Sequence, residues 1–392
     1  MGNGSKSILF LIDNVGTGGA EKVLSNLCGE FSRRGYECYY SSNYEVRNFA
    51  LFEDAKYLDL SIKERATVFG KVTALFLYWF KVLLIKKKIK PAATISFLER
   101  SNAVNVLSSC FGGKTVVSVR NNLELQYSKF SPFIGFLVKL FLSLIYFRRD
   151  VVVLSKGVGE QLGHFLFWKS NPIVIYNGYD ISLLKSKAKE LQKTTVKLPQ
   201  GKTSLAVACR LDKQKGIDIL LKAISGLPQH LSSQFVLNIY GDGPEKNELK
   251  KLVASRKLNE QVFFHGFVDN PWGDIARCDY FVFPSRWEGF GNSLAEAALL
   301  GIPSICSDCD YGPLEIYGIS DKIKSNYKIH SGGIIYRQSS LLEDDAVKNL
   351  SSALSFVFSE KPIFDTKICS EKVSNRFSND RIFDLWEGRI NE

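Results

Sequence analysis

The sequence predicts an α/β protein with two domains. Its 392 residues are enough for two domains of ordinary size. The apolar run Ile8–Ile12 leads into a glycine-rich loop and then a helical segment. The second half repeats this order between Tyr280 and Leu300, where a further apolar run follows the helix. A strand, a glycine-rich turn and a helix in that order are typical of nucleotide-binding α/β units.

Charge is distributed unevenly along the chain. Residues 1–177 contain 23 Lys and Arg against 13 Asp and Glu, which gives +10 of the total net charge of +11. A basic first half predicts an anionic partner for that half, either nucleic acid or an anionic membrane surface. Nucleic acid is disfavoured because the lysines lie among aliphatic rather than base-stacking residues.

Polar residues follow several predicted strands of the first half. The loop after Ile8–Ile12 contains the candidate binding residues Gly18 and Gly19, although a simple tight turn explains these glycines equally well. The predicted strand Thr115–Val119 ends at Arg120, and Ala92–Phe97 ends at a polar segment, residues 98–102. Ligands of open α/β sheets bind at such strand ends. A surface ion pair is an equally good explanation for Arg120.

Two apolar segments of the first half are related to membrane-binding sequences. Residues 68–91 combine five aromatic residues with six lysines, and residues 133–147 form an apolar run before Arg148 and Arg149. Each run contains a lysine, and the second is shorter than the roughly 20 residues that cross a bilayer. Both can be helices packed on the sheet with outward lysines. For residues 68–91 we favour a helix that also contacts the membrane surface.

The segment Phe281–Asp308 contains the strongest candidate site. The apolar run Tyr280–Phe283 predicts a buried strand, and the following turn leads into a helix that we expect Asn292 or Ser293 to cap. Backbone N–H groups at a helix start suit a phosphate. The candidate binding residues of this turn are Gly289, Phe290, Gly291, Asn292 and Ser293.

Two glutamates flank this turn, and their spacing is a more specific indication of function than the turn itself. Glu288 and Glu296 lie within P-S-x-x-E-G-F-G-N-S-x-x-E-A. This stretch resembles the E-x7-E signature of the retaining glycosyltransferases of family 4. The segment from Arg210 to Gly216 resembles the G-R-L-x-x-x-K-G element of that family, with Cys209 in place of the first glycine.

The resemblance implies the GT-B fold, with two Rossmann-like domains whose parallel sheets face each other across a cleft. It implies an acceptor-binding domain (1–178), a linker (179–201), a nucleotide-sugar-binding domain (202–370) and a C-terminal helix (371–392) that returns to the first domain. Arg210 and Lys215 would bind the diphosphate, Glu296 the ribose, and Glu288 the transferred sugar or its oxocarbenium-like transition state. In relatives the region of His265 reads the nucleotide base, but for His265 itself we favour a structural histidine.

The resemblance also implies the reaction and its partners. We expect transfer of a hexose or N-acetylhexosamine from a UDP-linked sugar to a lipid-linked oligosaccharide, in bacterial O-antigen- or capsule-type synthesis. The enzyme would act at the cytoplasmic face of the plasma membrane, as a peripheral protein, without a cofactor. Many relatives have a histidine near the position of Arg120; here its absence favours a front-face mechanism in which the departing phosphate accepts the proton.

Other functions remain open on the sequence alone. A nucleotide-sugar epimerase or phosphorylase of related fold does not need a basic first half. A non-catalytic protein of the membrane surface explains the charge but leaves Glu288 and Glu296 without a role.

We expect no metal: Cys306 and Cys309 have C-x-x-C spacing without a second pair, and Asp308-Cys309-Asp310 matches a D-x-D metal motif by coincidence.

Overall fold

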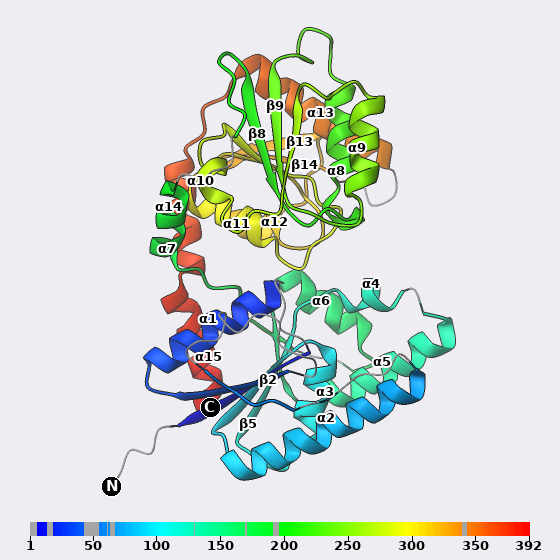
Figure 1. Ribbon diagram of the computed structural model, residues 1–392, viewed down its shortest axis with the longest axis vertical. Coiled ribbons are helices and arrows are strands. Elements are labelled where there is room, and N and C mark those ends of the chain that lie inside the picture. The colour runs from blue at the N-terminus through cyan, green and yellow to red at the C-terminus, as the bar shows by residue number, and fades with distance from the viewer. Residues whose placement is uncertain are drawn as a thin grey trace. The chain divides into compact units, whose positions relative to one another are not determined.

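The first sheet is parallel and has seven strands in the computed structural model, which describes residues 6–13, 19–42, 55–60, 62, 67–128, 130–168, 171–190, 196–338 and 343–392 (Figure 1). The strand order is β3-β2-β1-β4-β5-β6-β7. The strands are β1 (Ser7–Ile12), β2 (Glu37–Ser42), β3 (Lys56–Tyr57), β4 (Ala93–Phe97), β5 (Lys114–Val119), β6 (Asp150–Val153) and β7 (Ile173–Val174). The apolar runs predicted as strands in this half therefore form the centre of one sheet.

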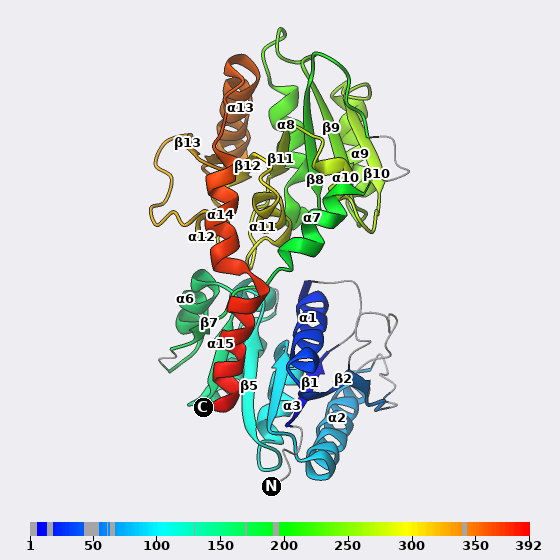
Figure 2. The ribbon, with the colours of Figure 1, turned by 90° about the vertical axis from the view of Figure 1, so that its left-hand side faces the viewer.

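Helices cover both faces of this sheet, so the side chains of β1 are buried on both sides. Ile8, Phe10 and Ile12 pack toward α1 and α15, and Leu9 and Leu11 pack toward α2 and α3. Figure 2 shows α15 along the sheet. The helices of this unit are α1 (Gly19–Arg33), α2 (Val68–Ile89), α3 (Glu99–Leu107), α4 (Leu123–Tyr127), α5 (Pro132–Tyr146), α6 (Lys156–Phe165) and α15 (Asn379–Asn391).

The second sheet also has seven strands in the described part of the chain, in the order β10-β9-β8-β11-β12-β14-β13. Its last pair is antiparallel, so the prediction of a wholly parallel sheet needs this correction. A short turn joins β13 to β14, and only an antiparallel pair can be joined that way. The strands are β8 (Thr203–Ala208), β9 (Phe235–Tyr240), β10 (Val262–Gly266), β11 (Tyr280–Phe283), β12 (Ser304–Ser307), β13 (Tyr327–His330) and β14 (Gly333–Tyr336).

One apolar core of the second unit lies between this sheet and helices α8, α9 and α13. Figure 1 shows these three helices together beside the sheet. The helices of the unit are α7 (Ile181–Lys189), the 3₁₀ turn η2 (Lys213–Lys215), α8 (Ile217–Ser225), α9 (Lys246–Ser255), α10 (Trp272–Ile275), α11 (Asn292–Leu299), α12 (Pro313–Tyr317), α13 (Glu343–Glu360) and α14 (Thr366–Phe377).

The chain divides into a first unit of residues 1–178 and 380–392 and a second unit of residues 179–379. The expected linker 179–201 contains helix α7, which begins where the Asp180 side chain accepts a hydrogen bond from the Leu183 N–H. The expected last helix, 371–392, is two helices separated at Ser378. Only α15 joins the first core, through Ile382, Phe383 and Trp386.

Helix α15 is held to the first unit by charge as well as by apolar packing. Arg34, just after α1, donates hydrogen bonds to Glu387 at 2.6 Å and to Asp384 at 2.9 Å. The last residues of the chain therefore complete the domain that the first residues begin.

Both apolar segments of the first half form helices, α2 and α5. Among the residues that the structure describes, neither these nor any other helix has the length and apolar character needed to cross a membrane.

Candidate active site

A buried ion pair lies where strands β8 and β11 end. Lys215 comes from the turn after β8 and Glu288 from the loop after β11, two strands that are adjacent in the sheet. The Lys215 Nζ donates to Glu288 Oε1 at 2.5 Å, and Ser285 Oγ donates to the same oxygen at 2.8 Å. Gln214 Nε2 lies 3.4 Å from the second carboxylate oxygen. The structure thus brings together two residues that the sequence separates by 73 positions.

The Lys215–Glu288 pair is largely shielded from solvent. Glu288 is 7% exposed, and the Lys215 side chain is 21% exposed. Burial disfavours the Lys215 ammonium, but the adjacent Glu288 carboxylate outweighs burial and raises the pKa of Lys215 above its usual value. Lys215 therefore remains a cation at neutral pH, as a phosphate-binding residue requires.

Close backbone packing holds the two loops against each other. Gly216 has a φ of +64°, and a Cβ atom there would lie 2.0 Å from the Pro284 carbonyl oxygen. Any other residue would therefore push the Lys215 turn away from the loop of Glu288. On its other side this loop is paired with the segment after β12, because Glu288 N–H donates to Asp310 O and Tyr311 N–H donates to Glu288 O.

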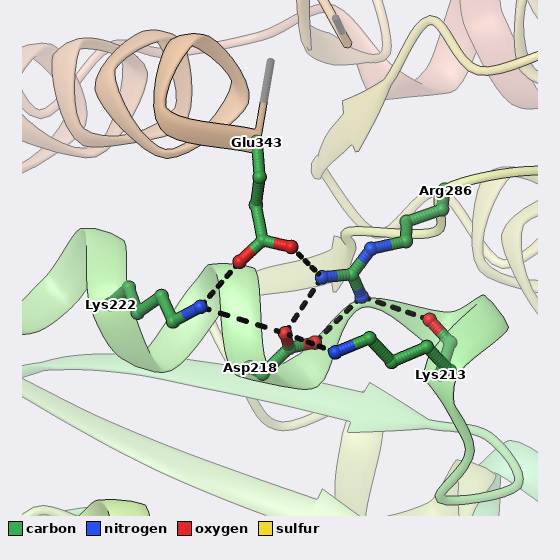
Figure 3. Close-up of polar contacts among 5 residues, drawn as sticks. All are labelled: Lys213, Asp218, Lys222, Arg286 and Glu343. Atoms are coloured by element: carbon green, nitrogen blue, oxygen red, sulfur yellow. Dashed lines mark hydrogen bonds and ion pairs between the residues drawn. The ribbon is translucent and has the colours of Figure 1, made fainter. Parts of the chain in front are cut away.

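Arg286 anchors the same loop through a network of ion pairs (Figure 3). Its guanidinium donates two hydrogen bonds of 2.7 Å to the Asp218 carboxylate and one of 2.7 Å to Glu343. Lys222 pairs with Glu343 as well. Burial disfavours the charge of Asp218, but Arg286 outweighs it and lowers the pKa of Asp218. The sequence analysis did not single out Arg286, although it lies two residues before Glu288.

Helix α11 begins next to this loop, but not with the predicted cap. Gly291, at a φ of +98°, occupies the cap position without a side-chain hydrogen bond, so the prediction of Asn292 or Ser293 as the cap was wrong. Asn292 instead accepts a hydrogen bond from the Tyr179 hydroxyl at 2.9 Å. With no Cβ, glycine adopts the left-handed conformation that turns the chain into the helix.

The remaining candidates of this segment differ in how their side chains are placed. Phe290 is 2% exposed and packs edge-on against Phe377, so its side chain belongs to the core rather than to a ligand surface. Glu296 is buried in α11. Gly289 and Ser293 are partly exposed at the turn and the helix start.

Arg210 follows strand β8 of the second sheet, and His265 lies within strand β10. The side chain of Arg210 is 71% exposed and donates to Asp212 at 2.5 Å. His265 stacks on Tyr240 with ring centroids 4.6 Å apart and bonds Asn238 through Nε2 at 2.9 Å. Burial lowers the pKa of His265 below its usual value, which keeps the ring neutral at pH 7.

The predicted site residues of the first unit have different surroundings. Gly18 lies outside the described residues, and Gly19 is the first residue of α1. Arg120 is 6% exposed, donates to Asn177, and lies 5.1 Å from the centroid of the Phe97 ring. Its guanidinium is therefore packed inside the unit next to the turn that ends it.

The carboxyl ends of β1 and β4 bring together two acids: Asp13, which was not predicted as a site residue, and Glu99, which lies in the predicted polar segment 98–102. Asp13 accepts hydrogen bonds from Ser101 N–H at 2.9 Å and Ser101 Oγ at 2.7 Å. Glu99 accepts one from Gln126 Nε2 at 3.3 Å, and burial raises the pKa of Glu99 to about 7. Burial also raises the pKa of Asp13. Their positions after strands were the signal that could have identified them.

The motifs that suggested a metal have ordinary surroundings. The thiols of Cys306 and Cys309 are buried and free. Asp308 accepts a hydrogen bond from the Gln338 N–H at 2.6 Å. Asp310 lies 3.8 Å from the Lys322 ammonium. Within the described ranges, no group of His, Cys, Asp and Glu side chains has the arrangement of a metal site.

Residues 188–321 match the family model described as "Glycosyl transferases group 1". The matched segment includes Arg210, Lys215, Glu288 and Glu296, and therefore the whole buried ion pair.

Similar curated proteins include bacterial glycosyltransferases. The chain is 28% identical over 347 residues to the N-acetylgalactosamine-N,N'-diacetylbacillosaminyl-diphospho-undecaprenol 4-alpha-N-acetylgalactosaminyltransferase of Campylobacter jejuni, covering 86% of this chain and 91% of that protein. It is 31% identical over 199 residues to the O-antigen biosynthesis glycosyltransferase WclY of Escherichia coli, covering 50% of this chain and 54% of that protein.

Solved structures agree with the fold. HepE of Anabaena in complex with UDP and glucose has a TM-score of 0.76 at 19% identity and covers 98% of this chain and 99% of its own. The lipopolysaccharide outer core galactosyltransferase WaaB has a TM-score of 0.72 at 18% identity, with coverage of 98% and 99%. With two α/β units of seven strands each, the chain has the GT-B fold.

Proposed function

We propose that this chain is a retaining glycosyltransferase that transfers a hexose or N-acetylhexosamine from a UDP-linked sugar. The acceptor is a lipid-linked oligosaccharide of O-antigen- or capsule-type synthesis. The observation that carries the proposal is the buried Lys215–Glu288 pair next to the start of α11. The relative from Campylobacter jejuni, named for a diphospho-undecaprenol substrate, supports an acceptor on a polyisoprenoid diphosphate.

The donor diphosphate is bound by cations and by the start of α11. The Lys215 ammonium has three N–H donors, of which one is used by Glu288, so the others can reach a phosphate. Arg210 is the exposed cation of the same loop and can bind a second phosphate bidentately. The backbone at Gly291–Ser293 adds the partial positive charge of a helix N-terminus, and Glu296 binds the ribose hydroxyls.

Transfer requires one bond to break and one to form at the anomeric carbon. The bond from that carbon to the diphosphate oxygen breaks while the acceptor hydroxyl oxygen bonds to the same face. The acceptor proton moves to the departing diphosphate. Lys215 and Arg210 stabilise the charge that grows on the diphosphate, and Glu288 stabilises the oxocarbenium-like carbon or holds the sugar hydroxyls. This route needs no histidine at the position of Arg120.

The first unit contacts an anionic membrane in this proposal. Helices α2 and α5 contain no acidic residue, and both expose large apolar side chains. Lysines lie among them, which is the composition of an interfacial surface. Peripheral binding at the cytoplasmic face would bring the site to its lipid-linked acceptor.

The test is acceptor-dependent UDP release from a panel of UDP-sugars, with the anomeric configuration of the product determined by NMR. Glu288→Gln should abolish release, while Lys251→Ala, which removes an exposed ion pair with Glu248, should leave it unchanged. An inverted product would disprove the retaining mechanism. An altered sugar formed without acceptor would indicate an epimerase, and release of a sugar phosphate would indicate a phosphorylase.

A non-catalytic protein of the membrane surface is the second candidate, because the exposed apolar helices alone would support it. It predicts binding to anionic vesicles but no binding of UDP. Calorimetric titration of UDP into the wild-type protein separates the two functions.

A further inference from the structure

An apolar groove of about 370 Å³ lies between helices α2, α3 and α5 of the first unit. Phe76 and Trp79 of α2 form one wall, and Phe141 of α5 lies opposite. Ala103, Val104 and Leu107 of α3 form the floor. Figure 1 shows α3 between the two longer helices. The groove belongs to this unit alone and is separate from the Lys215–Glu288 pair.

The residues that line the groove expose large apolar side chains to solvent. Phe76 is 60% exposed, Leu107 is 53% exposed and Phe141 is 43% exposed. Exposed apolar side chains continue on both helices outside the groove, at Leu77, Phe80 and Leu84 of α2 and at Phe133, Phe136 and Leu144 of α5. A contiguous apolar surface of this kind marks an interaction site in a soluble domain.

Several polar side chains of these helices already form hydrogen bonds within the unit, so few remain to bond a protein partner. Tyr78 bonds Ser101 at 3.1 Å, Thr73 donates to the Gly70 carbonyl at 3.0 Å, and Ser143 accepts from the Phe167 N–H at 3.0 Å. Within the described residues, the Trp79 indole N–H is the polar group of the groove lining without a partner. Protein interfaces of standard size contain about ten hydrogen bonds. A hydrocarbon needs none.

Helices α2 and α5, which form the walls of the groove, carry charge of one sign. Neither α2 nor α5 contains Asp or Glu, whereas Lys71, Lys87, Lys88 and Lys139 lie on their surfaces. This complements a ligand with an apolar chain and an anionic phosphate head. A second copy of this chain would bring the same positive charge and be repelled.

We infer that the groove between α2, α3 and α5 binds the polyisoprenoid chain of the lipid-linked acceptor. The inference rests on the proposed function and adds a binding site for the part of the acceptor that does not react. Holding the chain on the protein fixes the attached diphosphate and sugar near the first unit, which lowers the entropic cost of bringing the acceptor to the reaction.

The probe is farnesyl diphosphate, a short and water-soluble isoprenoid diphosphate, titrated calorimetrically without membranes. We expect it to bind the wild-type protein at least about tenfold more tightly than inorganic pyrophosphate. Phe76→Asp and Leu107→Asp, which place a charge on one wall and on the floor of the groove, should abolish that difference. Leu84→Asp introduces the same charge on exposed α2 outside the groove and should retain it within about twofold. Circular dichroism and thermal unfolding check that each variant folds.

The remaining outcomes overturn the inference. Equal affinity for farnesyl diphosphate and pyrophosphate would show that the chain is not bound. If Leu84→Asp and Phe76→Asp weakened farnesyl diphosphate binding equally, the groove would be part of a general bilayer-contacting surface. If dodecyl phosphate bound as tightly as farnesyl diphosphate, the groove would bind any alkyl chain rather than an isoprenoid. UDP release measured separately with a short-chain acceptor tests the proposed function, so the two can fail independently.

Discussion

Two buried charges beside the candidate site of the second unit have partners of opposite sign, whereas two buried charges of the first unit, Glu99 and Lys86, do not. Lys215 faces Glu288, and Arg286 faces Asp218. In the first unit, Glu99 is bonded by the amide of Gln126, and Lys86 donates to the side-chain and backbone oxygens of Asn105. The partners of these two buried charges are neutral.

The difference decides which groups remain charged. The pKa of Lys215 is raised by its partner in spite of burial, so the Lys215 ammonium keeps its charge at neutral pH. Burial raises the pKa of Glu99 to about 7 and lowers that of Lys86 to about 7. Permanent charge suits a diphosphate ligand. A carboxyl group that titrates near neutral pH suits a ligand with uncharged hydroxyls, such as an acceptor sugar.

The largest effect is expected for Lys215→Ala. Removing the ammonium removes transition-state stabilisation and leaves the Glu288 carboxylate buried without its cation. We expect acceptor-dependent UDP release to fall by about 10²–10³-fold and the free energy of unfolding to fall by about 3–5 kcal/mol. The double variant Lys215→Met/Glu288→Gln should recover stability but not activity, because no unpaired charge remains. Recovery of activity in the double variant would show that the pair is structural only.

Arg286→Ala should have the next largest effect, on stability. It leaves Asp218 and Glu343 without their guanidinium partner, and we expect a loss of about 3 kcal/mol, measured by chemical unfolding. Lys251→Ala removes an exposed pair on α9 and should change stability by less than about 1 kcal/mol. Equal effects of the two variants would contradict the importance of the Arg286 network.

Glu99→Gln tests the uncompensated acid of the first unit. The folded-state pKa of Glu99, about 7, lies above the ordinary glutamate pKa of 4.5. Between these pH values the folded protein holds a proton that the unfolded chain has released, so the stability of the wild-type protein falls as pH rises through this window. The total loss is on the order of 3 kcal/mol. Glu99→Gln should flatten the curve of unfolding free energy against pH; an unchanged curve would refute the assignment.

Lys86→Met should have the smallest net effect. The folded-state pKa of about 7 lies below 10.5, so the unfolded chain binds more protons in this window and the stability of the wild-type protein rises with pH. Methionine removes a buried charge but also two hydrogen bonds, so we expect a net change within about 1–2 kcal/mol at pH 7. The diagnostic readout is the slope above pH 7, which should decrease in the variant.

Much of the fold could be predicted from local patterns. Apolar runs identified β1, β4, β5 and β11, because strands buried on both faces are nearly continuously apolar. β2 and β14 were not predicted: β2 contains Glu37 and ends in two tyrosines and two serines, and β14 has only three apolar residues. Their burial comes from neighbouring strands rather than from their own composition.

The candidate site was predicted in part. The motif spacing identified Glu288, Glu296, Arg210 and Lys215 within the segment that matches the family model. It did not predict that Lys215 and Glu288 pair, nor that Arg286 anchors their loop, because both depend on contacts between distant segments. It also assigned Phe290 to the ligand site, although the side chain packs on Phe377, which lies far along the chain.

By itself, the sequence determined the order of strands and helices, the glycine turns and the uneven charge, since each depends on neighbouring residues. Tertiary structure alone decided which charges meet, which acids lose water, and where the apolar faces of α2 and α5 leave a groove. It also placed α15 with the first sheet, more than 300 residues away along the chain. The reason is physical: a pKa shift or a groove depends on surroundings that only folding assembles.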